Sequence, residues 1–394
     1  MAEKRKLIFV NTHPVQYYAP LYKQIAADNF FDLEVWYCTR HGLQGELDKE
    51  FNTPVKWDTP VLDGYKYKFL KNRALKPGLY SGFWGVVNPS ILTELKQLPK
   101  NSIIVSNAWN PFSNLYTILC SKILGHKTCL RAEPPLVHEF GRSGMMTAIR
   151  KLLLGRLLFR FVDVFLYIGT QNKKFYEYFG VDTSKLYFSP YSVNNVFFTE
   201  QASILLPRKL ELRRKLNIPE GNRVVLYSGK LIPKKRPLDL LLVFKRILDH
   251  KNYSLVFMGD GELRSDLEKV MRDHDIGNTI ITGFINQSKI SEYYAMADIF
   301  VMCSDVGETW GLSTNEAMNF GLPLIISDRT GNYEDLVDQN GYVIKCGDLE
   351  DFTDKLEKLL TETKEELAIK GNRSRELVAK FSYETVIENL KKIS

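Results

Sequence analysis

Residues 304–323 read SDVGETWGLSTNEAMNFGLP, and this stretch predicts a strand, a loop and a helix in that order. The apolar run Ile299–Met302 before it is typical of a buried parallel strand, and Asn315–Phe320 carries helix-favouring residues up to a stop at residues 321–323. A loop between a strand end and a helix start points its backbone N–H groups outward, and Gly311 allows a ligand to approach closely. The stretch therefore predicts an anion site, with a phosphate as the usual occupant.

Two glutamates of this stretch are candidates for binding a sugar. Glu308 is expected at the mouth of the loop, and Glu316 is expected in the first turn of the helix, one layer further in. An ionised carboxylate only accepts hydrogen bonds, so two of them beside a phosphate suggest sugar hydroxyls. The alternative is that Ser313 and Glu316 form a capping box and that Glu308 is a solvated loop acid. The residues alone leave both interpretations open.

The spacing E-x7-E, with W-G-L inside it and EAM-x-x-G-x-P at its end, resembles the nucleotide-binding signature of the retaining glycosyltransferases of family four. The resemblance implies the GT-B fold, an α/β architecture of two doubly wound Rossmann-like domains that face each other across a cleft. It implies that Glu308 contacts the donor sugar and that Glu316 holds the ribose hydroxyls. The amides around Trp310, Gly311 and Leu312 would face the sugar and the diphosphate. Relatives commonly carry Phe at the position of Trp310, so the tryptophan is expected to alter the sugar pocket.

A second motif follows the predicted strand Val224–Ser228, where the loop Gly229–Pro237 holds four basic residues. Four cations in one loop are costly to gather unless an anion balances them, although a solvated run of charge is the alternative. The loop is similar to the family pattern G-[RK]-x-x-x-x-K. That similarity implies that Gly229 adjoins the donor and that Lys230 and Lys235 stabilise the charge on the leaving nucleoside diphosphate.

Two further loops of the second half match the family. The strand Ser254–Met258 ends in G-D-G-E, in which Gly259 and Gly261 let the backbone turn close to a ligand. Relatives seat the nucleotide base against the backbone of the following G-x-x loop. The residues of that loop in this chain are Gly283, Phe284 and Ile285.

The length of 394 residues favours two domains, each large enough to bury a core. We expect an acceptor-binding domain over residues 1–194 and a donor-binding domain over residues 195–382. The amphipathic segment at residues 383–394 is expected to be a helix, and the resemblance implies that it joins the first domain.

Apolar runs alternate with helical patterns through the first half, which predicts an open parallel sheet with helices on both faces. The expected strands are Leu7–Val10, Leu33–Tyr37, Ile103–Val105, Thr128–Leu130 and Val164–Ile168, and the expected helices are Tyr18–Ala27, Ser113–Leu124 and Thr170–Phe179. Ligands of such sheets bind beyond the carboxyl ends of the strands.

Three residues of these strand-end loops are candidates on the acceptor side. His13 directly follows the first strand, where it could exchange a proton with the acceptor, or serve only as a turn residue beside Pro14. Glu133 and His138 follow the strand that ends near Arg131. The Pro-Pro turn after Glu133 could equally hold both at the surface.

Residues 142–160, RSGMMTAIRKLLLGRLLFR, combine five basic residues with a very apolar remainder. A helix of this kind suits docking at an anionic membrane surface, and many members of the family act on lipid-linked acceptors. The alternative is a half-buried helix whose long basic side chains reach water from its edges.

Composition excludes several classes of function. The net charge of +7 is moderate and spread along the chain, and no zinc-finger spacing, aromatic RNA-binding motif or basic tail indicates nucleic acid. The five cysteines are odd in number and scattered, which is typical of reduced core residues. The one D-x-D match, at residues 273–275, ends a charged segment remote from the motifs. We therefore expect no metal and no cofactor.

The apolar run after the charged N-terminus is too short for a signal peptide, and the apolar region at residues 152–168 is interrupted by charges. The expected location is the cytoplasm, either free or peripheral on the cytoplasmic face of the membrane.

Together these features predict a retaining, metal-independent hexosyltransferase. It would move a sugar from a nucleotide-sugar, most simply a UDP-sugar or a GDP-sugar, to a hydroxyl of a saccharide or lipid-linked acceptor in bacterial cell-surface polysaccharide or glycolipid synthesis. Retention comes from the resemblance alone. The alternatives are a nucleotide-sugar 2-epimerase of the same fold and a non-catalytic, transferase-like binding subunit.

Overall fold

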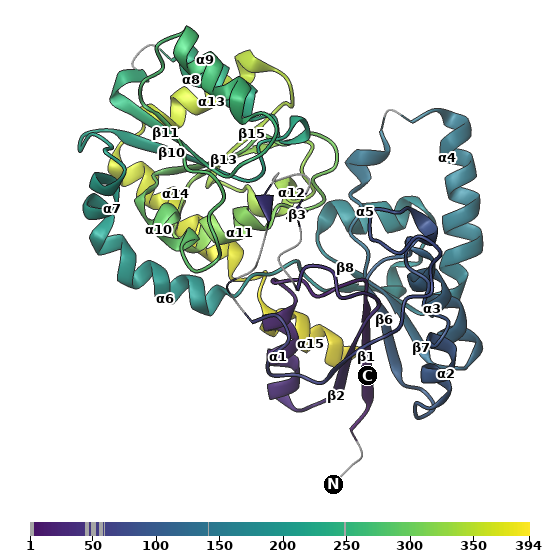
Figure 1. Ribbon diagram of the computed structural model, residues 1–394. Helices are drawn as coiled ribbons and strands as arrows, with labels where there is room; N and C mark the ends of the chain where they lie inside the picture. The colour runs from purple at the N-terminus through teal and green to yellow at the C-terminus, as the bar shows by residue number, and fades with distance from the viewer. Residues whose placement is uncertain are drawn as a thin grey trace. The chain divides into compact units, whose positions relative to one another are not determined.

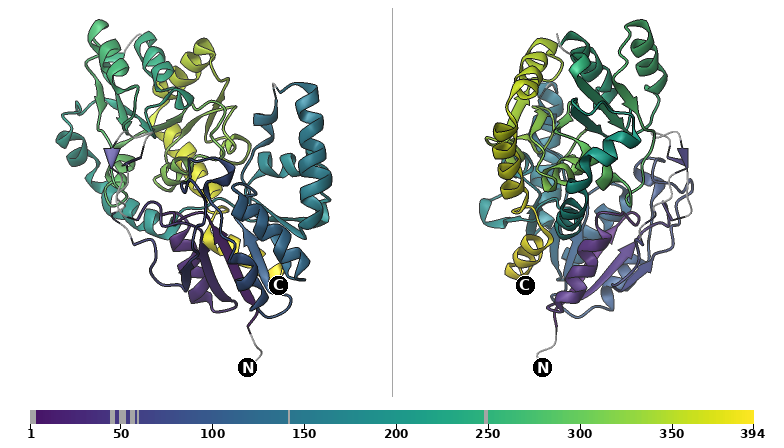
Figure 2. Two further views of the ribbon diagram at one scale, coloured as in Figure 1. Left: turned by 45° about the vertical axis from the view of Figure 1, so that its right-hand side comes forward. Right: turned by 90° about the vertical axis from the view of Figure 1, so that its left-hand side faces the viewer.

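The computed structural model describes residues 4–43, 47–48, 53–54, 58, 60–140, 142–247 and 250–394. The chain divides into two compact units, and in each of them helices cover both faces of a sheet (Figures 1 and 2). The first unit comprises Met1–Glu46, Thr59–Tyr191 and Tyr383–Ser394, and the second comprises Leu47–Asp58 and Ser192–Ser382.

The first unit is built on a seven-stranded sheet in the order β5-β2-β1-β6-β7-β8-β9, in which every pairing is parallel. Its strands are β1 (Lys6–Asn11), β2 (Asp32–Tyr37), β5 (Tyr67–Phe69), β6 (Ile103–Ser106), β7 (Lys127–Leu130), β8 (Val164–Tyr167) and β9 (Leu186–Phe188). The central strands are almost continuously buried because helices lie on both faces, as their apolar sequences require.

The helices of the first unit are α1 (Ala19–Asp28), η1 (Phe83–Gly85), α2 (Ile91–Lys96), α3 (Phe112–Ile123), η2 (Leu136–Glu139), α4 (Gly144–Arg150), η3 (Lys151–Leu158), η4 (Phe159–Phe161), α5 (Thr170–Tyr178), η5 (Thr183–Lys185) and α15 (Tyr383–Lys392). The last of these, α15, lies beside α1 (Figure 1). It buries Tyr383, Val386, Ile387 and Leu390 in the same core as β1 and β2. These residues recur at helical spacing, so one face of α15 is apolar and needs cover.

The second unit is built on a six-stranded parallel sheet in the order β12-β11-β10-β13-β14-β15. Its strands are β10 (Arg223–Ser228), β11 (Tyr253–Met258), β12 (Thr279–Ile281), β13 (Ile299–Met302), β14 (Leu324–Ser327) and β15 (Gly341–Ile344). The chain adds β11 and β12 on one side of β10 and then crosses to add β13, β14 and β15 on the other side. Its direction of winding therefore reverses between β10 and β13. Such a switch point opens a crevice at the carboxyl ends of the two strands.

The helices of the second unit are α6 (Asn195–Leu205), η6 (Leu206–Arg208), α7 (Lys209–Lys215), η7 (Pro233–Lys235), α8 (Pro237–Arg246), η8 (His250–Asn252), α9 (Arg264–Asp273), α10 (Ile290–Met296), α11 (Leu312–Asn319), α12 (Tyr333–Leu336), α13 (Leu349–Thr361) and α14 (Lys364–Val378). The unit also contains a short antiparallel pair, β3 (Leu47–Asp48) with β4 (Thr53–Pro54).

The strands expected in the first half are confirmed, whereas two were missed. β5 and β9 are three residues long and lie at the edges of the sheet, so they lack the buried apolar run that marks a central strand. The helix after the 304–311 loop begins at Leu312, earlier than its composition predicts. Gly311, in a left-handed conformation with φ 87°, ends the loop immediately before it.

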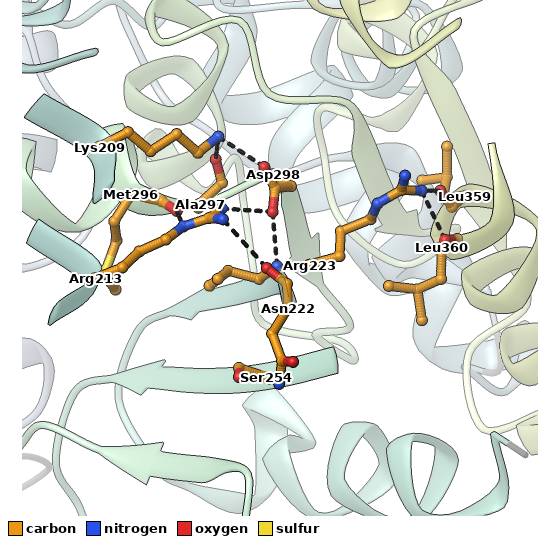
Figure 3. Close-up of polar contacts among 11 residues, drawn as sticks. Lys209, Arg213, Asn222, Arg223, Ser254, Met296, Ala297, Asp298, Leu359 and Leu360 are labelled. Carbon is orange, nitrogen blue, oxygen red and sulfur yellow. Dashed lines mark hydrogen bonds and ion pairs between the residues drawn. The ribbon is translucent and has the colours of Figure 1, made fainter. Parts of the chain in front are cut away.

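An ion-pair cluster joins α7 to the amino-terminal edge of the second sheet (Figure 3). The Asp298 carboxylate accepts from Lys209 Nζ at 2.7 Å, from Arg213 Nη2 at 2.5 Å and from the Val224 amide at 2.7 Å. Lys209 also donates to the carbonyl of Ala297, and Arg213 also donates to the carbonyl of Met296, the last residue of α10. Burial alone would raise the pKa of Asp298, but the two cations outweigh it and hold the pKa below its usual value.

We expect Asp298→Asn to lower the free energy of unfolding by about 2 kcal/mol, because two cations lose their shared anion in a partly buried place. The folded-state pKa is depressed, so this stabilisation is present above about pH 4 and is lost as pH falls through the folded value. Urea titrations of wild type and variant at neutral and acidic pH measure both effects. Asp354→Asn, at an exposed position of α13, is the matched control. Equal stability of Asp298→Asn and wild type at neutral pH would contradict the prediction.

Candidate functional site

The motif loops of the second half come together at the carboxyl ends of β10 and β13. The loop after β10 carries Lys230 and Lys235, and the loop after β13 carries Glu308 before α11 brings Glu316. Because β10 and β13 are neighbours in the sheet, both loops border the crevice at the switch point. The two sequence motifs are therefore one site in the fold.

Lys235 and Glu308 form an ion pair within this site. The pair joins the one-turn helix η7 to the loop after β13, and 19% of the Lys235 side chain and 13% of the Glu308 side chain remain exposed. Glu308 is thus no solvated loop acid, as the alternative interpretation held.

The four basic residues of the 229–237 loop differ in their charge partners and in their exposure. The guanidinium of Arg236 donates to Asp239 at 2.7 Å and to Asp305 at 3.1 Å, so two carboxylates balance it within the fold. Lys235 has Glu308 as its partner, Lys230 is half-buried and Lys234 is exposed. The expectation that a bound anion must balance all four cations is wrong for Arg236, because the acids that neutralise it lie in other elements.

Glu316 lies on α11 with its carboxylate against α10. Tyr294 of α10 donates to Glu316 Oε2 at 2.6 Å and also contacts Ser228 Oγ, the last residue of β10, at 3.2 Å. Burial raises the pKa of Glu316 to about 7, although hydrogen bonds from Tyr294 and Gln287 oppose that rise. The carboxylate is therefore poised to gain from a ligand that donates hydrogen bonds to its ionised form.

The capping-box interpretation of Ser313 and Glu316 is wrong. The N-cap residue of α11 is Gly311, and no side chain caps it. Ser313 instead donates to the carbonyl of Ser228 at 3.2 Å, which ties the first turn of α11 to the end of β10. Both residues of the expected box are engaged with other elements.

Trp310 is a packing residue. Its side chain is 1% exposed, its indole N–H donates to Asn315 Oδ1 at 2.9 Å, and its ring packs against Phe381 with centroids 5.4 Å apart. The expectation that the indole reshapes the sugar pocket is therefore corrected, and only the backbone at this position is a candidate for ligand contact. Gly311 next to it is needed because a Cβ there would lie 2.3 Å from Met302 Sδ.

The glycines after β10 and β11 let two loops pack backbone against backbone. A Cβ on Gly259 would lie 1.9 Å from the carbonyl oxygen of Gly229, and one on Gly261 would lie 2.6 Å from that of Leu231. Gly259 also forms a bridge to Gly283 after β12. The glycine pattern thus has a structural cause, and the half-buried Phe284 and Ile285 follow the bridge as the expected base-binding loop.

Tyr294 and Ser228 are the residues of this site that sequence reasoning missed. Tyr294 belongs to a helix without a recognised motif, and Ser228 is the last residue of a strand. Hydrogen bonds between elements far apart in sequence leave no local pattern that could have revealed them.

In the first unit, His13 follows β1 and is half-buried. Its Nδ1 lies 2.9 Å from Thr12 Oγ1, and its ring meets the His41 ring edge-on at 5.7 Å between centroids. Burial and the neighbouring His41 lower the pKa of His13 to about 4. The imidazole is therefore neutral at pH 7 and able to accept a proton or a hydrogen bond.

Glu133 belongs to a different cluster after β7. It accepts from the hydroxyl of Tyr18 at 2.7 Å and lies 3.7 Å from Nη1 of the buried Arg131. The Arg131 guanidinium lies over the rings of Tyr18 and Tyr191. His138 is half-buried in η2. The carboxylate of Glu133 is thus held by an arginine and a tyrosine at a strand end.

The segment 142–160 forms α4, η3 and the start of η4, and most of its apolar side chains face solvent. The exposed ones are Met145, Met146, Ile149, Leu152, Leu153 and Leu157. Glu139 pairs with Arg142 and Arg150, and Lys151 Nζ lies 3.8 Å from the centroid of the Tyr178 ring. Leu158 and Phe159 pack into a core of the first unit, so the segment has one buried face, as the alternative expects, and one exposed apolar face.

The described residues show neither a metal cluster nor a membrane-spanning helix. No group of three or more His, Cys, Asp or Glu side chains is placed to hold a metal ion. Among the same residues, none of the helices is both long and apolar enough to traverse a bilayer. The metal-independent mechanism stays a prediction.

Residues 208–376 match the family described as "Glycosyl transferases group 1". A sulfoquinovosyl transferase (SQD2) of Arabidopsis thaliana is 32% identical over 183 residues, 45% of this chain and 34% of the relative. A lipopolysaccharide 1,2-N-acetylglucosaminetransferase of Salmonella typhimurium is 32% identical over 137 residues, 32% of this chain and 36% of the relative. This chain thus spans about a third of the length of each of these two relatives.

Solved structures resemble the whole chain. The crystal structure of Anabaena HepE in complex with UDP has a TM-score of 0.71 and 15% identity, with 98% of this chain and 99% of that chain covered. A likeness at this identity speaks for the fold alone. It confirms the predicted GT-B architecture of two Rossmann-like domains.

Proposed function

We propose that the protein is a hexosyltransferase, because residues 208–376 match the family described as "Glycosyl transferases group 1". It moves a sugar from a nucleotide-sugar to a hydroxyl of a saccharide or lipid-linked acceptor, in glycolipid or polysaccharide synthesis. The names of the sulfoquinovosyl and lipopolysaccharide relatives support this class of product. UDP in the structure of the HepE neighbour supports a nucleotide-sugar as the donor.

The observation that carries the proposal is the placement of Lys235, Glu308 and Glu316 at the switch point between β10 and β13. Sheets of this kind bind nucleotides there. The site offers cations for a diphosphate and carboxylates for sugar hydroxyls, which are the two chemical groups of a nucleotide-sugar.

The residues act as follows in this proposal. Lys230 and Lys235 stabilise the charge that develops on the leaving nucleoside diphosphate. Glu308, held by Lys235, accepts from hydroxyls of the donor sugar, and Glu316 accepts from the ribose. The backbone of Gly311 and Leu312 borders the diphosphate.

The acceptor hydroxyl must lose a proton as the new glycosidic bond forms. In a retaining reaction the acceptor attacks the face that the diphosphate leaves, and a donor phosphate oxygen takes that proton. His13, neutral at pH 7, and Glu133 orient the acceptor through hydrogen bonds. No protein side chain then has to act as the base.

The first test is thermal stabilisation by nucleotides. We expect one of UDP, GDP, ADP and CMP to raise the stability of the protein by about 2.7 kcal/mol at a hundredfold excess over its dissociation constant. Melting curves at equal nucleotide concentration identify the base. If no nucleotide shifts the melting temperature, the second unit is not a working donor site and the proposal fails.

We further propose that the apolar face of residues 142–160 rests on an anionic membrane. Arg156 and Arg160 are exposed beside the exposed leucines, so apolar insertion and attraction to anionic lipid occur on one segment. The apolar face and the basic residues together fit a surface of lipid headgroups.

Leu152→Glu should weaken binding to phosphatidylglycerol vesicles at least about tenfold, because it replaces an exposed leucine of the docking face with a carboxylate that anionic lipid repels. Co-sedimentation with vesicles measures the change. Ile123→Glu, at another exposed apolar position of the first unit, is the matched control and should bind like wild type. Equal loss in both variants would argue against a specific docking face.

A further inference from the structure

A cavity lies in the first unit, beyond the carboxyl ends of β2 and β5. Its volume is about 450 Å³, and the loops that follow these two strands, with residues 77–79, line it. The position obeys the same rule that places the donor site in the second unit, since open parallel sheets bind ligands beyond their strand ends. The cavity is large enough for a phosphate group and part of the molecule that carries it.

Three basic side chains line the cavity. Arg40 and His41 come from the loop after β2, Lys71 comes from the loop after β5, and no aspartate or glutamate is among the described residues of the lining. Within the part of the chain that the structure describes, no ion pair joins Arg40 or Lys71 to a carboxylate. The donor site differs, because there Glu308 balances Lys235 and two aspartates balance Arg236.

Arg40 is held in a geometry that suits an anion. Its guanidinium lies 4.5 Å from the centroid of the Phe69 ring at the end of β5. An arginine over an aromatic face keeps its N–H donors in the guanidinium plane, where they can bind two oxygens of one anion. Lys71 also lines the cavity, and its ammonium adds a point charge from a separate loop.

We infer that this cavity binds a phosphate group of the acceptor through Arg40 and Lys71. The inference rests on the proposed function, because it names the class of acceptor that the transferase would use. Cations from two loops match an anion with several oxygens and more than one charge better than they match a single carboxylate. The phosphate can belong to a soluble sugar phosphate or to a lipid headgroup.

Calorimetric titration with inorganic phosphate tests the cavity directly. Arg40→Gln/Lys71→Gln should bind phosphate at least about tenfold more weakly than wild type, since it removes both charge-assisted donors. Arg73→Gln/Lys76→Gln removes two charges from exposed positions of the same loop outside the cavity lining, and it should bind like wild type. Lys230→Gln/Lys235→Gln removes any phosphate bound at the donor site and should leave the cavity's affinity unchanged.

The outcomes separate this inference from the proposed function. Absence of phosphate binding to wild type, or equal binding by wild type and Arg40→Gln/Lys71→Gln, overturns the inference even if nucleotides still stabilise the protein. If no nucleotide stabilises wild type, the proposed donor site is overturned, and phosphate binding at the cavity is unaffected. Vesicles of phosphatidylglycerol with phosphatidylcholine then distinguish the source. Weaker vesicle binding by Arg40→Gln/Lys71→Gln than by its control assigns a lipid headgroup, and equal binding assigns a soluble phosphate.

Discussion

Lys235→Ala is expected to lower kcat by about 100- to 1,000-fold, with a smaller change in nucleotide affinity. The ammonium lies at the switch point of the second sheet, where the proposed function has charge develop on the leaving diphosphate as the sugar bond breaks. A group that acts on developing charge affects the transition state more than the bound substrate. Initial rates of transfer at saturating donor measure kcat. Lys234→Ala, at the exposed neighbour in the same loop, should retain wild-type rates.

The ion pair with Glu308 offers a competing explanation that a double variant can test. If Lys235 served only to balance Glu308, then Lys235→Ala/Glu308→Gln would remove the unpaired carboxylate and recover both stability and rate. If Lys235 stabilises the diphosphate, the double variant recovers stability but stays slow. Recovery of the rate in the double variant would contradict the catalytic role of Lys235.

Glu316→Gln is expected to weaken nucleotide binding about 100-fold, because an amide replaces a carboxylate that accepts from two ribose hydroxyls. Tyr294 keeps a hydrogen-bond acceptor in the variant, so the local packing of α10 and α11 is preserved. Calorimetry with the stabilising nucleotide measures the loss. Glu350→Gln, at an exposed position of α13, is the matched control. An affinity of Glu316→Gln equal to that of wild type would remove Glu316 from the site.

The pH dependence of the same binding follows from the raised pKa of Glu316. The unliganded carboxyl has a pKa of about 7, and in the proposed function the ribose hydroxyls bind its ionised form. Wild-type affinity should therefore rise with pH, by about 100-fold between pH 5 and pH 8. The affinity of Glu316→Gln should lack the pH dependence that comes from ionisation of Glu316. It should vary with pH only as the nucleotide's own phosphate titrates. Parallel pH profiles for the two proteins would contradict the assignment.

Residue order alone specifies the class of fold and the position of its main strands. The apolar runs that became β1, β2, β6, β7 and β8 are buried on both faces, and such runs are visible without any partner. The E-x7-E spacing likewise places Glu308 and Glu316 around one loop, because strand, loop and helix are local features. The three-residue edge strands β5 and β9 escaped notice, since an edge strand needs no continuous apolar run.

The tertiary structure decided how the charged residues are used. Whether a basic residue of the 229–237 loop faces a ligand or an acid depends on the elements beside it, and those come from distant parts of the chain. Asp305 neutralises Arg236, Glu308 meets Lys235, and Tyr294 orients the carboxylate of Glu316. The same holds for burial, because Trp310 lies in the core whereas Leu152, Leu153 and Leu157 are exposed. Burial and pairing are sums over neighbours in space, so no local pattern contains them.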